Sequence, residues 1–457
     1  MAARDGRTLR RLTEAAGLGA GRFVADDAAR FALTELLGDS TIAAPEHWRG
    51  RSILLATHRQ RDTIRALLAL DGVAARLVIA PPDLAPSQLP AILADAAIDA
   101  ALCDRAELTE AFPAGLPQLA LAEAAVPPAG PAEHTEWVLL TSGTSGQPKL
   151  VVHDLTSLAG PVADGLAVRE NPVWSTFYDV RRYGGMQILL RALIGGGSLL
   201  LSSAAEPVSY FLARAGAAGV THISGTPSHW RRALMSGSAE RLAPRYVRLS
   251  GEIADQAILD QLTAAFPKAA ISHAFASTEA GLAFDVRDRR AGFPVDFVGK
   301  ADALAELRIV NGTLHIRSAR AANRYLTRGV RALRDAEGFV DTGDMVERDG
   351  DRYRFAGRRE GVINVGGQKV HPEEVEAVIA RRPGVKMARV RAQSSPITGA
   401  LVVADIVVEP AAGDLVALKD DILAACRAAL PAHKVPAIVR AVPALELSEA
   451  GKLVRHA

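Results

Sequence analysis

The stretch DTGDMVERDGDRYRFAGRREGVINVGGQKVHPEEVE, residues 341–376, changes its character twice and divides the chain. Its first part alternates polar and apolar residues around an Asp-Gly pair, which predicts a β-hairpin. A charged turn, GRREG at residues 357–361, follows it. The chain then restarts with a helix that opens on Pro372 and carries acids in its first turn. We therefore predict a domain boundary near residues 357–361.

Upstream of this boundary, the chain alternates helical and strand patterns. Residues 220–227, 246–252 and 269–279 each form an apolar run that ends in a polar loop (VTHISGTP, YVRLSGE and AAISHAFASTE). This recurring pattern of strand and polar loop predicts an α/β domain with a largely parallel sheet. In such domains ligands bind beyond the carboxyl ends of the strands. Residues 305–318 predict a further hairpin with an Asn-Gly turn, which begins a β-meander.

The N-terminal region and the region after the boundary complete the prediction. Residues 26–38 have helical spacing, and two short apolar runs at 51–57 and 76–80 predict buried strands. After the boundary, strands at 386–393 and 400–409 precede a helix at 414–430. The fold class is therefore α/β, with a large N-terminal domain of mixed or parallel sheets, flanking helices and a meander, plus a small α+β C-terminal domain.

Composition limits the classes of function. The chain has 457 residues and a formal net charge of +2, which gives no electrostatic case for nucleic acid as a partner. Its two cysteines, Cys103 and Cys426, fit neither a disulfide framework nor a zinc knuckle. The apolar runs are too short to span a membrane, and the Arg-rich start leads into no apolar signal region. We expect a cytoplasmic enzyme or binding protein, a monomer or a homodimer.

The loop LLTSGTSGQPKL, residues 139–150, is rich in Ser, Thr and Gly. Gly143 and Gly146 permit the backbone to form a nest for an anion, and Lys149 adds a mobile cation. The spacing is not that of a Walker loop, because Pro148 precedes the lysine and no Lys-Ser/Thr pair follows. Taken alone, a loop of this composition is more often an ordinary surface turn.

Five motifs that follow one another along the chain indicate what this loop does. The loop at 141–149 is followed by RLSGEIAD (248–255), HAFASTEAG (273–281), the stretch at 341–376 and SEAGKLVRHA (448–457). This series resembles the adenylate-forming superfamily, which includes acyl- and aryl-CoA synthetases, adenylation domains of peptide synthetases and luciferases. The resemblance is strongest to an acyl- or aryl-CoA ligase. It covers residues 139–457, whereas residues 1–138 match loosely and look abbreviated.

The resemblance implies a role for each motif. Glu279 would hold Mg²⁺, Thr278 would contact the α-phosphate of ATP, and Lys452 would catalyse adenylation. Phe275 would lie against adenine, Asp344 would bind the ribose, and Arg358 would assist. The β- and γ-phosphates would be held by Thr141, Ser142, Gly143, Thr144, Ser145, Gly146 and Lys149, and the adenine would be lined by Ser250, Gly251 and Glu252.

The resemblance also implies two domains that move. The AMP-binding domain would span residues 1–359 and the mobile C-terminal domain residues 360–457, with Glu360 at the hinge. After the acyl-AMP forms and pyrophosphate leaves, the C-terminal domain would rotate and a thiol would enter beside Gly366 and Gly367. The cofactors implied are ATP, Mg²⁺ and CoA.

The acid and its acceptor are less defined. Tyr178, Tyr183 and Thr226 fall in the segments that form the acid pocket, although a His-x-x-Gly element usual in CoA ligases is missing there. Arg181 or Arg182 could pair with a second carboxylate of the acid, or form a surface pair. We favour CoA as the acceptor; a carrier-protein phosphopantetheine is the alternative, and an inactive nucleotide-binding homologue is a third interpretation.

Overall fold

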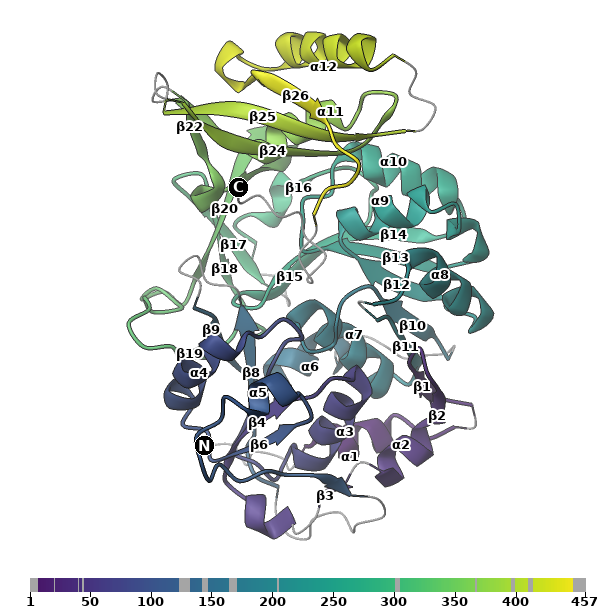
Figure 1. The fold of residues 1–457 in the computed structure, drawn as a ribbon, viewed down its shortest axis with the longest axis vertical. Helices are drawn as coiled ribbons and strands as arrows, with labels where there is room; N and C mark the ends of the chain where they lie inside the picture. Colours follow the sequence, from purple (N-terminus) through teal and green to yellow (C-terminus); the bar gives the residue numbers. More distant parts are fainter. Residues whose placement is uncertain are drawn as a thin grey trace.

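The computed structural model describes residues 7–19, 21–39, 41–42, 45–122, 132–141, 147–163, 171–203, 205–300, 305–365, 368–395, 399–409 and 414–446. Two sheets and their helices form the large N-terminal domain, and the last part of the chain forms a small domain at the opposite end of the molecule (Figure 1). No helix in these described ranges is long and apolar enough to cross a membrane.

The first sheet contains the strands that the sequence predicted to end in polar loops. Its order is β15 (Gly281–Val286), β14 (Ala270–Ser277), β13 (Tyr246–Ser250), β12 (His222–Gly225), β10 (Val173–Thr176), β11 (Ser198–Leu201), β1 (Phe23–Ala25) and β2 (Arg30–Ala32). Neighbours from β14 to β1 are parallel, and the pairs at both edges are antiparallel. The prediction of a largely parallel sheet is confirmed, and β12, β13 and β14 end side by side.

The second sheet carries the Ser/Thr/Gly loop. Its order is β19 (Arg324–Tyr325), β9 (Lys149–Asp154), β8 (Glu136–Thr141), β5 (Arg76–Ile79), β4 (Ser52–Ala56) and β6 (Ala100–Cys103). The strands predicted at 51–57 and 76–80 are its centre. A small separate pair joins β3 (Thr41–Ile42) and β7 (Leu121–Ala122).

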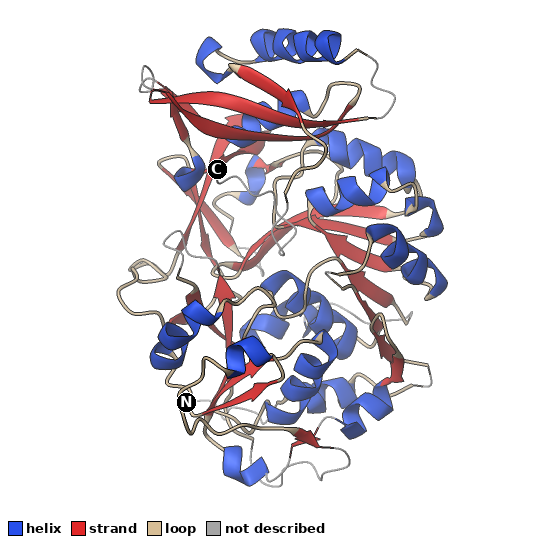
Figure 2. Cartoon of the chain, viewed as in Figure 1, coloured by secondary structure: helices blue, strands red, loops and turns tan. Residues whose placement is uncertain are grey.

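Helices fill the space between the two sheets and cover their outer faces (Figure 2). The middle layer contains α1 (Leu9–Ala15), α3 (Gln60–Leu70), α6 (Leu155–Ala163) and α7 (Tyr183–Ile194). The outer face of the first sheet is covered by α8 (Val208–Ala217), α9 (Pro227–Met235) and α10 (Gln256–Ala265). The second sheet is covered by α4 (Leu89–Asp95) and the short α5 (Ala106–Thr109). Apolar side chains of the strands bury against each layer, so α7 is enclosed on both sides.

The prediction of one helix over residues 26–38 is wrong in its first half. Asp26 accepts hydrogen bonds from the backbone N–H groups of Ala28 and Ala29, at 3.0 and 2.8 Å, which closes a turn. The chain then forms β2, and α2 spans only Leu33–Asp39. Local side-chain bonding of an aspartate therefore overrides the helical spacing.

The predicted meander forms a third sheet, in the order β16 (Phe293–Pro294), β21 (Arg352–Arg358), β20 (Val340–Asp349), β18 (Thr313–Arg317) and β17 (Glu306–Val310). The β17–β18 turn has Asn311 at φ 50° and Gly312 at φ 76°, the positive values that a tight hairpin of this twist requires. The Asn-Gly and Asp-Gly hairpins are both confirmed.

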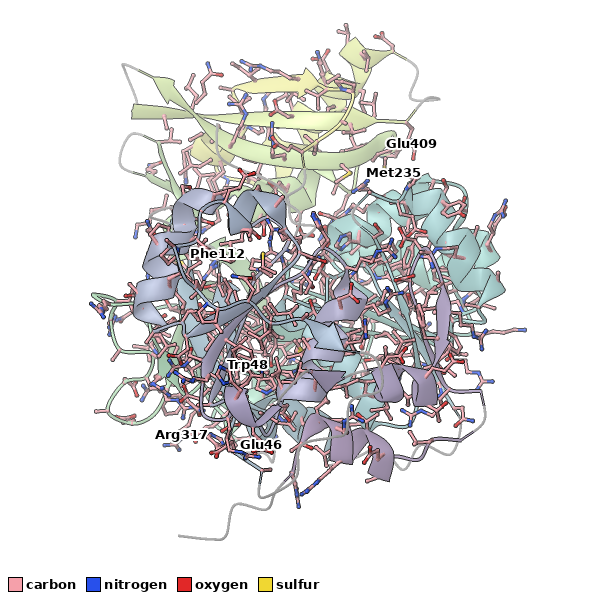
Figure 3. All side chains as sticks on the ribbon, turned by 60° about the horizontal axis from the view of Figure 1, so that its bottom comes forward. Glu46, Trp48, Phe112, Met235, Arg317 and Glu409 are labelled. Atoms are coloured by element: carbon pink, nitrogen blue, oxygen red, sulfur yellow. The ribbon has the colours of Figure 1, made fainter. Side chains whose placement is uncertain are left out.

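The C-terminal domain contains the β22 (Ile363–Val365) and β23 (Gln368–Val370) pair, α11 (Pro372–Ile379), and the sheet of β24 (Val385–Ser395), β25 (Gly399–Val408) and β26 (Ile438–Ala441), covered by α12 (Leu415–Ala429). It has its own apolar core, to which Val375, Val390 and Ile422 belong. The fold class is therefore confirmed. Met235, at the end of α9, and Glu409, just after β25, are labelled where the two domains face each other (Figure 3). The exact boundary near residue 360 stays a prediction.

Candidate nucleotide and acid site

The Ser/Thr/Gly loop joins two antiparallel strands. Thr141 ends β8 and pairs across the ladder with Lys149, which begins β9. The lysine therefore opens a strand and not the helix that follows a Walker loop. The Thr141 hydroxyl oxygen is buried and has no hydrogen-bond partner among the described residues, so it can still donate to a phosphate. Ser142, Gly143, Thr144, Ser145 and Gly146 lie outside the described residues.

Thr278 and Glu279 follow β14 and are tied to β9. The Nε2 of His153, on β9, donates to the Thr278 carbonyl oxygen at 2.7 Å. Burial lowers the pKa of His153 to about 4, so the imidazole is neutral at physiological pH and serves as a structural donor. Ala322 N–H donates to the Glu279 carbonyl oxygen at 2.9 Å. Glu279 is thus held beside the later part of β9, near His153, whereas Lys149 opens that strand. Sequence reasoning had no signal for His153.

Gly281 explains why the turn after Glu279 is so tight. Its φ is +72°, and a Cβ there would lie 2.3 Å from the Arg320 carbonyl oxygen. Only glycine satisfies both conditions.

Glu279 is the described residue best suited to Mg²⁺. No group of three or more His, Cys, Asp or Glu side chains clusters as a metal site in the described ranges. A site of one carboxylate completed by nucleotide phosphates and water is the type that Mg²⁺ adopts with ATP. The donor set around Glu279 therefore fits this ion.

The segment that the sequence placed beside adenine follows β13. The Tyr178 hydroxyl donates to the Ser250 carbonyl oxygen at 2.7 Å, and Gly251 has φ +83°. The Glu252 carboxylate accepts from the Ser228 N–H at 2.9 Å and so caps the start of α9. Their contact with the base stays a prediction.

Phe275 lies in a row of aromatic rings. Its ring stacks on Phe355 with centroids 5.4 Å apart and an interplanar angle of 10°, and on Phe284 at 5.8 Å and 23°. The row connects β14 to the meander strand β21. Its predicted role beside adenine is not tested by these contacts.

Asp344 and Arg358 are brought together by the meander. They are directly opposite each other in the β20–β21 register, with 3.8 Å between Asp344 Oδ1 and Arg358 Nε. Arg358 also donates to the Thr342 carbonyl oxygen at 3.1 Å. The pair lies at the end of the meander, directly before the turn Arg359–Gly361 that leads into the C-terminal domain.

The three residues predicted for the acid pocket have different surroundings. Thr226 caps α9, where its hydroxyl accepts from the His229 N–H at 3.0 Å. Tyr178 is held by Ser250, and burial raises its pKa above the usual range. The Tyr183 hydroxyl, at the start of α7, is buried beside the Leu282 main chain, and burial raises its pKa above the usual range.

The two arginines considered for a second carboxylate are already paired. Arg181 is buried, and its Nη2 donates to Asp179 Oδ2 at 2.6 Å; the surface interpretation is therefore wrong for it. Arg182 pairs with Asp83. Both guanidiniums are therefore engaged with carboxylates of this chain, although Arg182 Nε has no hydrogen-bond partner among the described residues.

A different pair of arginines, which the sequence analysis missed, faces the predicted acid pocket. Tyr183, Gln187 and Arg191 are spaced four residues apart on α7 and so share one face of the helix. Across the sheet, Arg248 on β13 forms an ion pair with Asp285 on β15 at 3.0 Å. Burial and the charge of Arg248 lower the pKa of Arg191 to about 10. The charges of both Arg248 and Asp285 act on Arg191, so its guanidinium lies near this ion pair.

The sheet register shows how polar this face is. Thr176, Ser224, Arg248 and Ser272 are aligned across β10, β12, β13 and β14. Two residues earlier, Trp174, His222 and Tyr246 form a second row on the same face. Several buried atoms here have no hydrogen-bond partner among the described residues: Trp174 Nε1, Gln187 Oε1, Arg191 Nε and Ser224 Oγ. Because buried polar groups are normally satisfied, these atoms indicate a place for water or a ligand.

Other predicted residues cannot be placed. Lys452, Gly366 and Gly367 lie outside the described residues. Glu360 lies in the short 3₁₀ turn Arg359–Gly361, and its side chain is not described.

The structure combines a large α/β domain, whose parallel strands end in polar residues, with a small second domain. Family models agree: residues 46–320 match the AMP-binding enzyme family and residues 374–452 match the AMP-binding enzyme C-terminal domain. The chain belongs to the AMP-binding enzymes, the adenylate-forming superfamily. ATP-dependent activation of a carboxylic acid, followed by transfer to CoA, with ATP, Mg²⁺ and CoA as cofactors, is the chemistry of this group, and the predicted class of enzyme is confirmed.

Two similar proteins and one similar structure illustrate the kinds of enzyme in this family. A 2-succinylbenzoate–CoA ligase from Salmonella typhimurium is 29% identical over 349 residues, 74% of this chain and 72% of that protein. An isonitrile lipopeptide synthase from Streptomyces coeruleorubidus is 27% identical over 458 residues, 91% of this chain but 30% of that protein. The fold resembles that of the anthranilate CoA ligase AuaEII in complex with anthranoyl-AMP, with TM-score 0.82 and 18% identity over 98% of this chain and 95% of that one.

Proposed function

We propose that this chain adenylates an aromatic carboxylic acid that carries a second anionic group, and transfers the acyl group to CoA. The observation that carries the proposal is the cluster of the partly buried Arg191 and the buried Arg248 beside Tyr183. The Salmonella relative is named for 2-succinylbenzoate, an aromatic acid with two carboxyl groups, which supports the same class of substrate.

Charge balance is the physical reason. Asp285 is ion-paired with Arg248, whereas Arg191 has no ion pair among the described residues. Arg191 is partly buried, and the charge of Asp285 acts on it from a distance. An anionic group on the substrate would offset the remaining cost of removing this guanidinium from water. A carboxylate also matches the planar fork of a guanidinium.

Aromatic side chains supply the remaining surface. Tyr183 and the row Trp174, His222 and Tyr246 offer rings on the face that α7 covers; the Arg191 guanidinium lies 6.0 Å from the Trp174 ring centre. Flat apolar surfaces with a few polar atoms favour an aromatic acid over a long acyl chain.

The reaction requires control of charge. The acid carboxylate attacks the α-phosphate, pyrophosphate leaves, and negative charge spreads over the phosphoryl oxygens. We assign Lys149 and the 141–149 loop to the departing pyrophosphate, Thr278 to the α-phosphate and Glu279 to Mg²⁺, which would shield phosphate charge when bound. Lys452 would stabilise the α-phosphate and orient the acid. Positioned cations and donors of this kind typically contribute about 10²–10³ in rate each.

The thiol step would use the C-terminal domain. Rotation about a hinge at Glu360 would withdraw Lys452 and bring Gly366 and Gly367 to the carbonyl of the acyl-AMP. The thiolate would attack that carbonyl, and AMP would leave with the bonding electrons. A few hinge residues suffice for such a rotation.

A carrier-protein phosphopantetheine is the second candidate acceptor. The match to a lipopeptide synthase over most of this chain favours it. Both acceptors present the same thiol, so the first half-reaction is common to both.

The test is acid-dependent ATP–pyrophosphate exchange across a panel of aromatic acids, followed by AMP release with and without CoA. We expect exchange with aromatic dicarboxylates and AMP release that depends on CoA. Exchange without CoA-dependent turnover would favour the carrier route. Absence of exchange with every acid, in protein that binds MgATP, would refute the ligase assignment.

A further inference from the structure

The edge strand β19 adds a residue to the phosphate end of the site. Tyr325, on β19, pairs with Val151 on β9, two residues after Lys149. The pairing is continued by Leu326 N–H, which donates to the Leu150 carbonyl oxygen at 2.9 Å, and by Leu150 N–H, which donates to Thr327 Oγ1 at 2.7 Å. Residues 325–327 therefore hold the start of β9 from outside.

The side chain of Tyr325 lies between two predicted functional groups. The Lys149 ammonium nitrogen is 5.8 Å from the centre of the Tyr325 ring. Tyr325 follows Ala322 by three residues, and the Ala322 N–H donates to the Glu279 carbonyl oxygen at 2.9 Å, which brings Glu279 beside this strand. Burial, and next the charge of the neighbouring Glu279 and a hydrogen bond to its side chain, raise the pKa of the Tyr325 phenol. The phenol can therefore donate a hydrogen bond to that carboxylate.

These contacts matter because Lys149 and Glu279 carry opposite charges and lie on either side of Tyr325 along β9. They form no ion pair with each other in the part of the chain that the structure describes. A direct pair would occupy the carboxylate and the ammonium that the proposed reaction needs for Mg²⁺ and phosphate. A phenol between them gives Glu279 a donor that is neutral, and gives Lys149 an aromatic face.

We propose that Tyr325 is a positioning residue: its hydroxyl orients Glu279 toward Mg²⁺, and its ring holds Lys149 at the mouth of the phosphate loop. The proposal rests on the proposed function for the identity of the nucleotide and the ion. It adds that the metal requirement of the enzyme is set by a residue that touches neither substrate nor ion.

The two parts of the side chain can be tested separately. Tyr325→Phe removes the hydroxyl and keeps the ring. A hydrogen bond to a charged group contributes about 1.5–3 kcal/mol, so the Mg²⁺ concentration for half-maximal pyrophosphate exchange should rise about tenfold or more. ATP affinity measured by calorimetry in EDTA should stay unchanged, whereas the gain in affinity on adding Mg²⁺ should shrink. Tyr325→Leu should in addition weaken ATP binding in EDTA, because Lys149 loses its support.

Controls separate positioning from folding. Tyr210→Phe alters an exposed tyrosine, 58% accessible, and should leave both titrations unchanged. In a Glu279→Gln background, Tyr325→Phe should have no further effect on the Mg²⁺-dependent gain in ATP affinity, because the group that it orients is gone. A Tyr325→Phe variant with the Mg²⁺ dependence of the parent protein, or an undiminished effect in the Glu279→Gln background, would overturn the proposal. Because the calorimetry needs no acid, its result is independent of whether exchange identifies a substrate.

Discussion

The two faces of the first sheet are built by the same strands and have opposite compositions. Toward α8–α10, the sheet presents Ile223, Val247, Leu249 and Ile271, all buried in one apolar core. Toward α7, the alternate residues are Ser224, Arg248 and Ser272, with His222 and Tyr246 beside them. Strands of a parallel sheet are usually apolar on both faces. A single polar face on such strands therefore identifies the site, while the other face identifies the scaffold.

Neighbouring residues on β12 give the sharpest contrast. Ile223→Ala should lower the free energy of unfolding by about 2–5 kcal/mol, because it leaves a cavity in the core. Ser224→Ala should leave stability within about 0.5 kcal/mol or raise it, because the Ser224 hydroxyl is buried without a partner among the described residues. Urea unfolding of both variants checks this. Equal losses in the two variants would contradict the division of the faces.

Arg191 should affect substrate choice and not folding. Arg191→Met keeps the bulk of the side chain and removes the charge. We expect kcat/KM for an aromatic dicarboxylate to fall about 100-fold, whereas the matching monocarboxylate changes little, because only the former loses a buried ionic partner. Arg182→Met, which alters an arginine already paired with Asp83, is the control. A uniform loss for both acids would assign Arg191 to structure.

Asp71 is a buried charge that belongs to the scaffold. It accepts from Leu9 N–H at 2.6 Å and Trp137 Nε1 at 2.8 Å, and burial raises its pKa to about 6. Since this folded-state pKa lies above that of the unfolded chain, the native state holds its proton at higher pH. The contribution of Asp71 to stability should therefore be complete below about pH 4, and at most about 3 kcal/mol of it should be lost as pH rises through about 6. The free energy of unfolding, measured across this pH range, should lose this pH dependence in Asp71→Asn. The preference of the enzyme among acids should not change. A component that persists in the variant would assign it to another group.

Tyr178 should give the smallest effect. Tyr178→Phe leaves the Ser250 carbonyl oxygen without its donor and should reduce stability by about 1 kcal/mol, with a modest rise in KM for ATP. Thermal unfolding and initial rates at varied ATP measure both. An unchanged KM for ATP together with a loss of acid selectivity would place Tyr178 in the acid pocket alone.

The sequence was sufficient for the elements whose signals are local. The Asn-Gly and Asp-Gly hairpins, the helix that begins at Pro372 and the strands that end in polar loops follow from nearby residues, and each formed as predicted. The helix over 26–38 was mispredicted in its first half because the turn at Asp26 depends on side-chain bonding.

Contacts between distant residues could not be predicted in the same way. His153 meets Thr278, and Tyr325 meets Glu279, only because β9 lies beside β19 and the end of β14. Arg191 and Arg248 meet because α7 covers β13, a relation that depends on strand order. A weak sequence signal did exist: Ser224, Arg248 and Ser272 each interrupt an apolar strand on the same side. The assigned roles of Lys452, Glu360 and the phosphate loop stay predictions.

The polar face of the first sheet, toward α7, is proposed to bind a second anionic group on an aromatic acid. The most direct measurement of this preference is the ratio of kcat/KM in ATP–pyrophosphate exchange for an aromatic dicarboxylate and for the same acid without the second carboxylate. We predict a ratio of about 100 or more in favour of the dicarboxylate, the effect of one buried charge-assisted pair. A ratio near one, or a preference for the monocarboxylate, would contradict the account.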